Sequence, residues 1–573
     1  MQESRFFNLS TISEMRKIVF IALSILITPA WLCGQSVISS KHNLSASGPG
    51  TVKATSESEI CIFCHTPHAS RPVAPLWNRD DPGSTYTLYS SSTLEAVPGQ
   101  PDGSAILCLS CHDGTIALGN VVSRTTDIDF SGGITTMPAG PKNLTTDLSD
   151  DHPVSFSYTS AVASADGQLK DPAAIGMPVQ LENGKVQCVS CHDPHNDIYG
   201  KFLVATKQYS DLCFKCHDRN YWASSSHNLS GATWNNSGTN PWQHIEVPYA
   251  TVAENACENC HDPHNSGGKP RLLKAGPEEN NCLDCHNGNV AATDIETEIL
   301  KTYNHNVYNY NNIHDPTEAP LASTMHVECQ DCHNPHAVNN ATANAPNANG
   351  FLTGVMGIDQ GGNSVTTVAY EYELCYRCHA DSPSKPASVI NRQIEQNNVR
   401  LEFDLGNPSY HPVEGAGANN NVPSLIAPLT ESSVIYCTDC HASDGAAPAG
   451  PHGSIYPQIL KYRYETADFT PESATNYELC YNCHDRNSIL NDESFADHDR
   501  HIRREDTPCS VCHDAHGISN SQGNTTNNTH LINFDLNVVS PDNMGRLRFE
   551  DRGTFRGRCY LTCHGERHNP ESY

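Results

Sequence analysis

Apolar and polar residues follow no regular period over most of this chain. Stretches such as NNATANAPNANG (residues 339–350) and SQGNTTNNTH (residues 521–530) repeat neither every second residue, as a half-buried strand does, nor every 3.6 residues, as an amphipathic helix does. Such stretches predict loops, and only short segments beside the cysteines indicate helical turns. The pattern therefore predicts little regular secondary structure, with short helices joined by long loops.

The N-terminal segment breaks this pattern with one apolar run. Ile18–Ile27 is almost wholly apolar, Arg16 and Lys17 precede it, and polar sequence begins near Gln35. A basic end followed by a short apolar run predicts a secretory signal peptide over residues 1–34. The run is too short for a membrane span, and no later segment reaches spanning length. We therefore expect an exported protein.

Cys33, at the end of this segment, leaves lipid attachment open as an alternative. Leu32 occupies the position where a small residue normally precedes a lipidated cysteine, which favours an unmodified start. Because exported proteins usually use cysteines for disulfides, a disulfide framework is the first alternative for the remaining cysteines.

Composition changes the picture of a merely loop-rich chain. Hydrophobic residues make up only 37% and charged residues 17% of the 573 residues, both below the values of ordinary globular domains. Burial of apolar side chains alone cannot offset the ordering entropy of such a chain, so it is either disordered or folded around a large group that is not an amino acid. The 25 cysteines favour the second interpretation.

The net charge restricts the classes of partner. Asp and Glu number 64 against 35 Lys and Arg, which gives a net charge of -29. The chain has no basic stripe that would neutralise phosphates, and this argues strongly against nucleic acid and weakly against anionic membrane surfaces as partners.

Nearly all the cysteines belong to one repeated motif. After Cys33 the remaining 24 form twelve close pairs, each followed at once by a histidine. Eleven pairs match C-x-x-C-H, whereas composition alone predicts about 0.06 such matches. The twelve sites are Cys61-Cys64-His65, Cys108-Cys111-His112, Cys188-Cys191-His192, Cys213-Cys216-His217, Cys257-Cys260-His261, Cys282-Cys285-His286, Cys329-Cys332-His333, Cys375-Cys378-His379, Cys437-Cys440-His441, Cys480-Cys483-His484, Cys509-Cys512-His513 and Cys559-Cys563-His564.

The spacing fits covalent attachment of haem. Within one helical turn, residues i, i+3 and i+4 share a face, so both thiols can bond to the vinyl groups of one haem while the histidine reaches its iron. This is the attachment signature of c-type haem, and we expect about twelve such groups. Zinc sites and disulfides are weaker alternatives, because neither needs a histidine after every pair. In the last site one extra residue separates Cys559 from Cys563, which leaves the haem geometry open and a disulfide as the alternative.

A second histidine follows several motifs after a proline or an alanine. Pro263 ends the turn that carries His261, so His264 cannot reach the opposite side of the same iron. We expect it to be the second axial ligand of a neighbouring haem, which would bring the two haems close together. An ordinary surface histidine in a turn is the alternative at each site. The equivalent positions are His68, His195, His336 and His516.

Histidines are numerous enough to fill every sixth coordination position. Eighteen remain for twelve positions after the motif histidines are set aside, and only seven methionines exist, so bis-histidine ligation with low reduction potentials is predicted. The choices upstream of each pair are His42, His152, His227, His305, His411 and His498, and those after each first motif are His68, His195, His264, His336, His452 and His516. His244, His314, His326, His501, His530 and His568 are spare and could replace some of these.

The motifs group in chain order into six pairs. They predict a dodecahaem region over residues 35–573, built of paired-haem units at about 35–140, 141–222, 223–290, 291–385, 386–490 and 491–573. About 45 residues are available for each haem, too few for twelve independent domains. We therefore expect long loops wrapped around a closely packed haem array.

The repeated unit resembles a known family. CVSCHDPHNDIYGKFLVATKQYSDLCFKCHDRN and its repeat CENCHDPHNSGGKPRLLKAGPEENNCLDCHNGN resemble the doubled C-x-x-C-H cytochromes. CIFCHTPH, followed by PLWNR and CLSCHDG, is similar to the multihaem c-type cytochromes that metal-reducing bacteria place in the periplasm and on the outer surface. The resemblance covers the whole mature chain. It implies electron transfer toward extracellular acceptors, with other cytochromes or an outer-membrane porin conduit as partners.

Three hypotheses follow. The leading one is an electron carrier with no substrate chemistry of its own, exported to the outer-membrane surface or beyond rather than soluble in the periplasm. The rival is a multihaem reductase of a small nitrogen or sulfur oxyanion, which needs one iron with an open sixth position. The chain has no C-x-x-C-K variant, which favours the carrier. A homopolymer filament, joined through His42 or His568 of adjacent copies, is the third.

Overall fold

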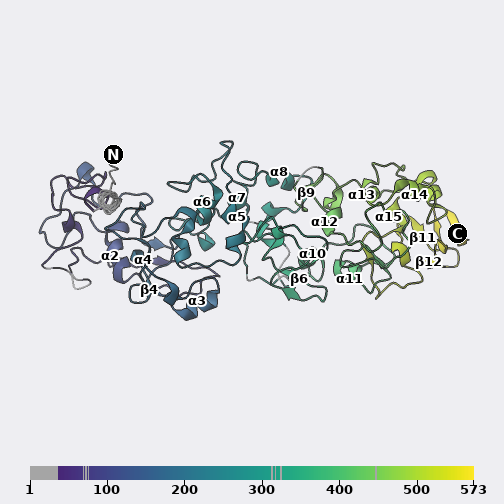
Figure 1. Ribbon diagram of the computed structural model, residues 1–573, viewed down its shortest axis with the longest axis horizontal. Coiled ribbons are helices and arrows are strands. Elements are labelled where there is room, and N and C mark those ends of the chain that lie inside the picture. The colour runs from purple at the N-terminus through teal and green to yellow at the C-terminus, as the bar shows by residue number, and fades with distance from the viewer. Residues whose placement is uncertain are drawn as a thin grey trace, which may run out of the picture. The chain divides into compact units, whose positions relative to one another are not determined.

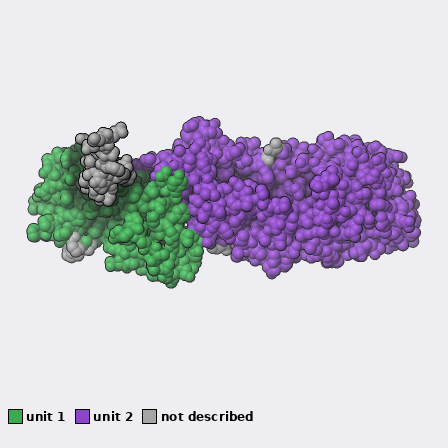
Figure 2. Space-filling model, in the orientation of Figure 1, with its two compact units in different colours: residues 1–218, 261–272 green, residues 219–260, 273–573 purple. Residues whose placement is uncertain are grey.

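Two compact units make up the chain. The computed structural model describes residues 37–68, 70, 74, 76–310, 314–316, 318–319, 321–322, 326–445 and 448–573, so the predicted signal peptide and Cys33 lie outside the described residues. Unit 1 comprises residues 1–218 and 261–272, and unit 2 comprises residues 219–260 and 273–573 (Figure 2). The division into six paired-haem units stays a prediction.

The elements of unit 1 are short and are separated by loops (Figure 1). In chain order, with η for a 3-10 helix, they are η1 (Val37–Ser39), η2 (Cys61–Phe63), β1 (Thr87–Leu88), α2 (Gly103–His112), η3 (Ser131–Gly133), β2 (Asp147–Leu148), β3 (Phe156–Ser157), α3 (Ser160–Asp166), η4 (Pro172–Ala174), β4 (Lys185–Val186), α4 (Cys188–Cys191), η5 (Gln208–Ser210), η6 (Cys213–Lys215) and η9 (Pro270–Leu272).

Unit 2 is built in the same way (Figure 1). Its first half contains η7 (Trp222–Ser224), α5 (Ser226–Leu229), α6 (Val252–Asn255), η8 (Ala256–Asn259), α7 (Glu279–Cys282), α8 (Ile295–Ile299), β5 (Tyr303–Asn304), η10 (Val307–Asn309), α9 (Cys329–Cys332), η11 (Gly350–Leu352), β6 (Gly357–Ile358), β7 (Ser364–Val365) and α10 (Glu371–His379). Its second half contains α11 (Val399–Phe403), β8 (Ser409–Tyr410), α12 (Cys437–Cys440), β9 (Gly453–Ser454), η12 (Pro457–Ile459), α13 (Glu478–Tyr481), α14 (Arg486–Leu490), the π-helix η13 (Arg500–Arg504), α15 (Cys509–Cys512), β10 (Gly517–Ile518), η14 (Thr529–Leu531), β11 (Val539–Ser540), β12 (Arg548–Asp551), β13 (Gly557–Cys563) and β14 (Glu566–Ser572).

The strand pairings are short. In unit 1, β1 pairs with β2 in parallel and β3 with β4 antiparallel. In unit 2, β5 with β9, β6 with β7 and β8 with β10 form two-stranded antiparallel ladders. Near the C-terminus β13 pairs antiparallel with β11, β12 and β14. Ladders this short cannot form a core by themselves, so the fold depends on what the loops pack against.

The predicted fold class, short helices and long loops of a multihaem cytochrome, is confirmed. The longer helices, α2 and α10, have 10 and 9 residues, and many others have only four. No helix in the described ranges has both the length and the apolar character of a membrane-spanning segment. Helices shorter than about 12 residues are marginal in isolation, so packing must stabilise them.

Apolar side chains gather around the cysteine motifs rather than in one central core. In unit 1, the buried Phe63 and Leu118 pack with the partly buried Cys64 and Cys111. In unit 2, similar clusters include Cys329, Cys437, Cys509 and Cys512. The apolar surface that composition predicts to be scarce is thus concentrated where haem would attach.

Buried arginines bind loops to one another. The Arg79 side chain is 1% exposed and donates to the carbonyl oxygens of Leu118 and Ser110 at 2.9 Å each and of Ala117 at 3.0 Å. Charge-assisted hydrogen bonds of this kind contribute about 1.5–3 kcal/mol each. They satisfy loop carbonyls that have no partner in a helix or a sheet.

Candidate functional site

The first eleven motifs form the predicted helical turn. Helices α4, α9, α12 and α15 begin and end at the two cysteines of a motif, and α2 and α10 end at the motif histidine. The backbone N–H of His192, for example, donates to the Cys188 carbonyl at 3.0 Å, which closes one turn. No disulfide bond joins these cysteines in the described part of the chain. Thiols and imidazole therefore lie on the face that haem attachment requires.

Most motif histidines face a second histidine across a constant distance. Nine such pairs occur within the units in the described part of the chain, with ring centroids 6.0 to 6.5 Å apart. In unit 1 they are His65–His195, His112–His42, His192–His264 and His217–His152. In unit 2 they are His286–His227, His333–His452, His379–His305, His441–His516 and His513–His498.

This distance matches two imidazoles on opposite sides of one metal ion. A metal–imidazole bond is about 2 Å and the ligating nitrogen lies about 1.1 Å from the ring centre, so two axial imidazoles have centroids about 6.2 Å apart. The described histidines therefore fit bis-histidine haem. All nine partners belong to the twelve second ligands that the sequence predicts.

Backbone carbonyls hold the motif histidines in the tautomer that binds a metal. Nδ1 donates to a carbonyl oxygen at 2.8 to 3.0 Å in six motifs, and this leaves Nε2 as the metal-binding nitrogen. The six bonds are His112–Lys142, His192–Lys201, His261–Arg271, His333–Phe351, His441–Gln458 and His513–His530.

The second ligands are held in related ways. Nδ1 of His42, His227 and His411 donates to the carbonyl of the residue before His195, His336 and His516, respectively. Two others donate to buried carboxylates, His264 to Asp151 at 2.8 Å and His516 to Glu402 at 2.9 Å. An anionic partner makes a ligating imidazole more basic.

Burial keeps several motif imidazoles neutral. It lowers the pKa to about 4 for His192, His286, His379, His441, His484 and His513. A neutral imidazole has the lone pair that a metal ion needs, so the motif histidines are ready to ligate at neutral pH.

The carbonyl acceptors form a local motif that the sequence analysis missed. The φ angle is 52° at Lys201, 57° at Arg271, 58° at Gln458 and 57° at His530. In each case the next residue along the chain also has a positive φ. This left-handed turn aims the carbonyl at the motif histidine. The sequence signal for this turn is a pair of apolar residues after the first motif of a predicted paired-haem unit. It occurs in KFLV, RLLK, QILK and HLIN.

Three further predicted ligands, His68, His484 and His336, have different surroundings. His68 is exposed and has no ring contact with another histidine in the part of the chain that the structure describes. His484 Nδ1 lies 2.9 Å from the Ser424 hydroxyl, and its pKa is lowered by burial and by the neighbouring His411. His336 packs against Trp222, with ring centroids 6.2 Å apart.

The last motif departs from the others. Cys559 and Cys563 lie in the extended strand β13, not in the helical turn that the sequence predicts. Residues four apart are separated by about 13 Å along a strand but about 6 Å along a helix. The extended conformation is favoured over a helical turn because both β12 and β14 pair with β13.

The histidines near this motif are arranged differently too. His564 does not face His498: its Nε2 lies 3.0 Å from both Asp468 carboxylate oxygens. The spare residues His501 and His568 face each other instead, with centroids 6.2 Å apart. This tenth facing pair has no motif histidine in it.

Consecutive motifs adjoin one another through their cysteines. Within a pair the second cysteines are neighbours: burial raises the pKa of the first-named thiol and the partner thiol raises it further, in Cys64–Cys111, Cys191–Cys216, Cys285–Cys260, Cys332–Cys378, Cys440–Cys483 and Cys512 with Cys559 and Cys563. Between pairs the first cysteines are neighbours, and the partner thiol and burial raise the pKa, in Cys108–Cys188, Cys282–Cys329, Cys375–Cys437 and Cys480–Cys509.

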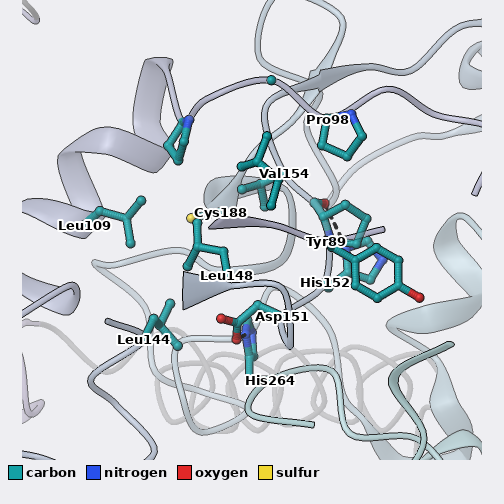
Figure 3. A pocket seen from close by; sticks show the side chains of 14 residues that line it. Tyr89, Pro98, Leu109, Leu144, Leu148, Asp151, His152, Val154, Cys188 and His264 are labelled. Carbon is teal, nitrogen blue, oxygen red and sulfur yellow. Dashed lines mark hydrogen bonds and ion pairs between the residues drawn. The ribbon is translucent and has the colours of Figure 1, made fainter. Parts of the chain in front are cut away.

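A cavity in unit 1 shows the surroundings of one motif (Figure 3). It is lined by apolar side chains, including Leu109 and Leu148, together with Cys188, His152 and His264. Apolar walls, a thiol and imidazoles are what an attached haem requires. The residues present therefore fit the cofactor that the motifs imply.

Comparisons with known proteins agree with this geometry. A family model described as the doubled CXXCH motif matches residues 180–220, 250–291 and 427–488. The multiheme cytochrome MtrA of Shewanella baltica (strain OS185) is 26% identical over 275 residues, which cover 46% of this chain and 57% of that protein. The match thus spans little more than half of the relative's length. The repeated motifs, the facing histidines and these matches together show that the chain is similar to the multihaem c-type cytochromes with doubled C-x-x-C-H motifs.

Proposed function

We propose that the protein transfers electrons along a chain of about twelve covalently bound haems, most of them ligated by two histidines. The observation that carries this proposal is the adjacency of consecutive motifs, which alternates between first and second cysteines within each unit. When bound, haem supplies a one-electron couple whose potential depends on its ligands and surroundings. Similarity to a multiheme cytochrome supports the same function.

The residues of the chain would set the potentials. Two imidazoles would hold each iron, and neither is a thioether, the ligand type that raises haem potentials. The carboxylates at His264 and His516 add negative charge to two of the ligands. We therefore expect low-potential, low-spin haems.

Some second ligands follow a motif of one pair but face the histidine of the preceding pair. These histidines would connect successive pairs of motifs. His195 follows the third motif but faces His65 of the first, and His264 follows the fifth but faces His192 of the third. Each such ligand belongs to the next pair along the chain. Loading of one haem would therefore fix the position of the following pair.

For the twelfth haem we propose His501 and His568 as axial ligands in place of His564. Support comes from the facing rings of His501 and His568 and from the contact of His564 with Asp468. His568→Ala should convert one haem of the holoprotein to the high-spin state in electron paramagnetic resonance, whereas the matched His564→Ala variant should not. The reverse result would contradict this assignment.

The test of the carrier function uses the same spectroscopy on the wild-type holoprotein. We expect no stoichiometric high-spin haem, no stoichiometric carbon monoxide binding, and no turnover of nitrite or sulfite. A ligand-binding haem at one per chain with turnover of either anion would instead establish the reductase. A haem count by mass of the mature chain would check the number twelve.

We further propose export to the outer-membrane surface or the extracellular space, with other cytochromes or a porin conduit as partners and an extracellular electron acceptor. The signal peptide predicted for residues 1–34 and the family resemblance support this location. Intact cells treated with a protease that cannot enter them should lose the protein. Protection in intact cells, and loss only after the outer membrane is opened, would place it in the periplasm.

The filament hypothesis is not part of the proposal. It relied on His42 and His568 as ligands to an adjacent copy, but each faces a histidine of its own chain. Electron micrographs of the purified holoprotein that show filaments would contradict this view.

A further inference from the structure

In unit 2 the side chains of five residues lie close together, and none of them is a cysteine or histidine of a haem motif. Glu328 occupies the N-cap position of α9 and Asp331 lies within α9, while His314, Glu318 and His326 come from the loop before it. Their side chains are only 1 to 16% exposed. Two of them, His314 and His326, are spare histidines of the haem assignment.

The distances between these groups are those of ligands around one ion. His314 Nδ1 lies 3.4 Å from a Glu328 oxygen, 3.4 Å from an Asp331 oxygen and 3.9 Å from a Glu318 oxygen. His326 Nε2 lies 3.6, 4.0 and 3.5 Å from oxygens of the same three residues.

Direct hydrogen bonds would be shorter than these separations. Donors bound at about 2.1 Å to one metal ion lie about 3.0 to 3.4 Å apart when they are neighbours. One ligand atom from each of His314, His326, Glu328 and Asp331 lies within 4.8 Å of all the others. A single ion fits between them.

The Glu328 carboxylate supplies an independent observation. Its side chain is 1% exposed, and neither oxygen has a hydrogen-bond partner. A buried carboxylate without a partner is strongly unfavourable unless a cation or donor compensates it. The carboxylate lies beside the two imidazole nitrogens, which is the position a shared cation would occupy.

The charge balance points to a divalent cation. Glu318, Glu328 and Asp331 carry three negative charges, and Arg377 contributes one positive charge at 2.7 Å from Glu318 and 2.8 Å from Asp331. With neutral histidines the cluster keeps two uncompensated negative charges. Nearby Glu278 is engaged elsewhere, since it accepts the backbone N–H groups of His314 at 3.1 Å and Gln330 at 2.8 Å.

We propose that His314, His326, Glu328 and Asp331, assisted by Glu318, bind one divalent first-row transition-metal ion that is separate from the haem irons. Imidazole nitrogen combined with carboxylate oxygen suits Zn²⁺, Fe²⁺ or Mn²⁺, whereas Ca²⁺ and Mg²⁺ take oxygen ligands almost throughout. The ion would tie the loop around His314 to α9 and so hold the Cys329–Cys332 motif in place.

Metal analysis of the holoprotein tests the proposal. Total iron, zinc and manganese are measured on protein desalted without chelator, and haem iron is measured separately from the absorbance of its pyridine adduct. We expect close to one divalent ion per chain beyond the haem iron. After stripping with dipicolinate, ZnCl₂ should rebind at one saturable site in calorimetry while the haem spectrum stays unchanged.

Two variants locate the site. Glu328→Gln and His326→Ala should each weaken ZnCl₂ binding by more than about 100-fold. The matched control is Glu371→Gln, a buried carboxylate that also lies beside a haem motif but accepts hydrogen bonds from Thr438 at 2.9 and 3.0 Å. The control should bind like wild type. Haem content per chain reports whether each variant has folded.

The proposal fails if the wild-type protein holds no ion beyond haem iron and shows no saturable zinc binding. It also fails if both variants bind zinc as tightly as the control. Either outcome would leave the electron-transfer proposal untouched, since that proposal is read from the haem spectra and this one from non-haem metal.

Discussion

Protonation of one buried carboxyl should make the stability of unit 2 depend on pH. Glu414 is 8% exposed, and the Tyr376 hydroxyl donates to it at 2.6 Å. Tyr376 is fully buried and lies inside the motif Cys375–Cys378. Burial raises the pKa of Glu414 from 4.5 to about 7, against the opposing effect of the hydrogen bond from Tyr376. The perturbation that tests this is Glu414→Gln.

The sign and size follow from linkage. The folded chain holds this proton more tightly than the unfolded chain, so the proton contributes stability that is fully present below pH 4.5 and is lost as the pH rises through about 7. A pKa difference between 4.5 and about 7 corresponds to about 3 kcal/mol. Glutamine does not titrate, so the variant lacks this loss. Relative to wild type, Glu414→Gln should therefore gain about 3 kcal/mol between pH 4.5 and 8.

Urea denaturation at several pH values, followed by haem absorbance, measures the difference. Because all other titrating groups are common to both proteins, the difference between the two curves isolates Glu414. The exposed Glu395 provides a control, and Glu395→Gln should give a curve parallel to wild type. If the Glu414→Gln and wild-type curves are also parallel from pH 4.5 to 8, the carboxyl is not held protonated by burial and the reasoning is refuted.

Two further predictions concern His516 and His264, second ligands that face the motif histidine of a preceding pair. Gly517 follows His516, and a Cβ there would lie 2.2 Å from the Glu402 carbonyl oxygen. We therefore expect Gly517→Ala to displace His516 and to produce one high-spin haem in electron paramagnetic resonance. An unchanged low-spin spectrum would count against the assignment of His516 as a ligand. Asp151→Asn removes the negative charge at His264 Nδ1. Spectroelectrochemistry should then show the reduction potential of one haem raised by on the order of 50 mV. Unchanged potentials at all haems would show that this carboxylate does not tune the haem.

The amino-acid sequence by itself determines where haem attaches. In a motif such as Cys188–Cys191–His192, the two thiols and the imidazole lie within five residues, and one helical turn brings them to a single face. The low apolar content likewise predicts a loop-rich chain that gathers around its motifs. These features are local, so spacing and composition are enough to predict them.

Only the tertiary structure decides which histidines face one another. His65 faces His195, and His333 faces His452, across more than a hundred residues of chain without periodic pattern. Nothing in that intervening sequence specifies where a loop returns.

The C-terminal region shows the same limit, since the strand pairing that holds Cys559 and Cys563 extended was not visible in their spacing. The convergence of His314 and His326 on Glu328 also depends on how a loop folds back onto α9. Local geometry is encoded in residue spacing, whereas a ligand brought from a distant loop depends on the path of the whole chain.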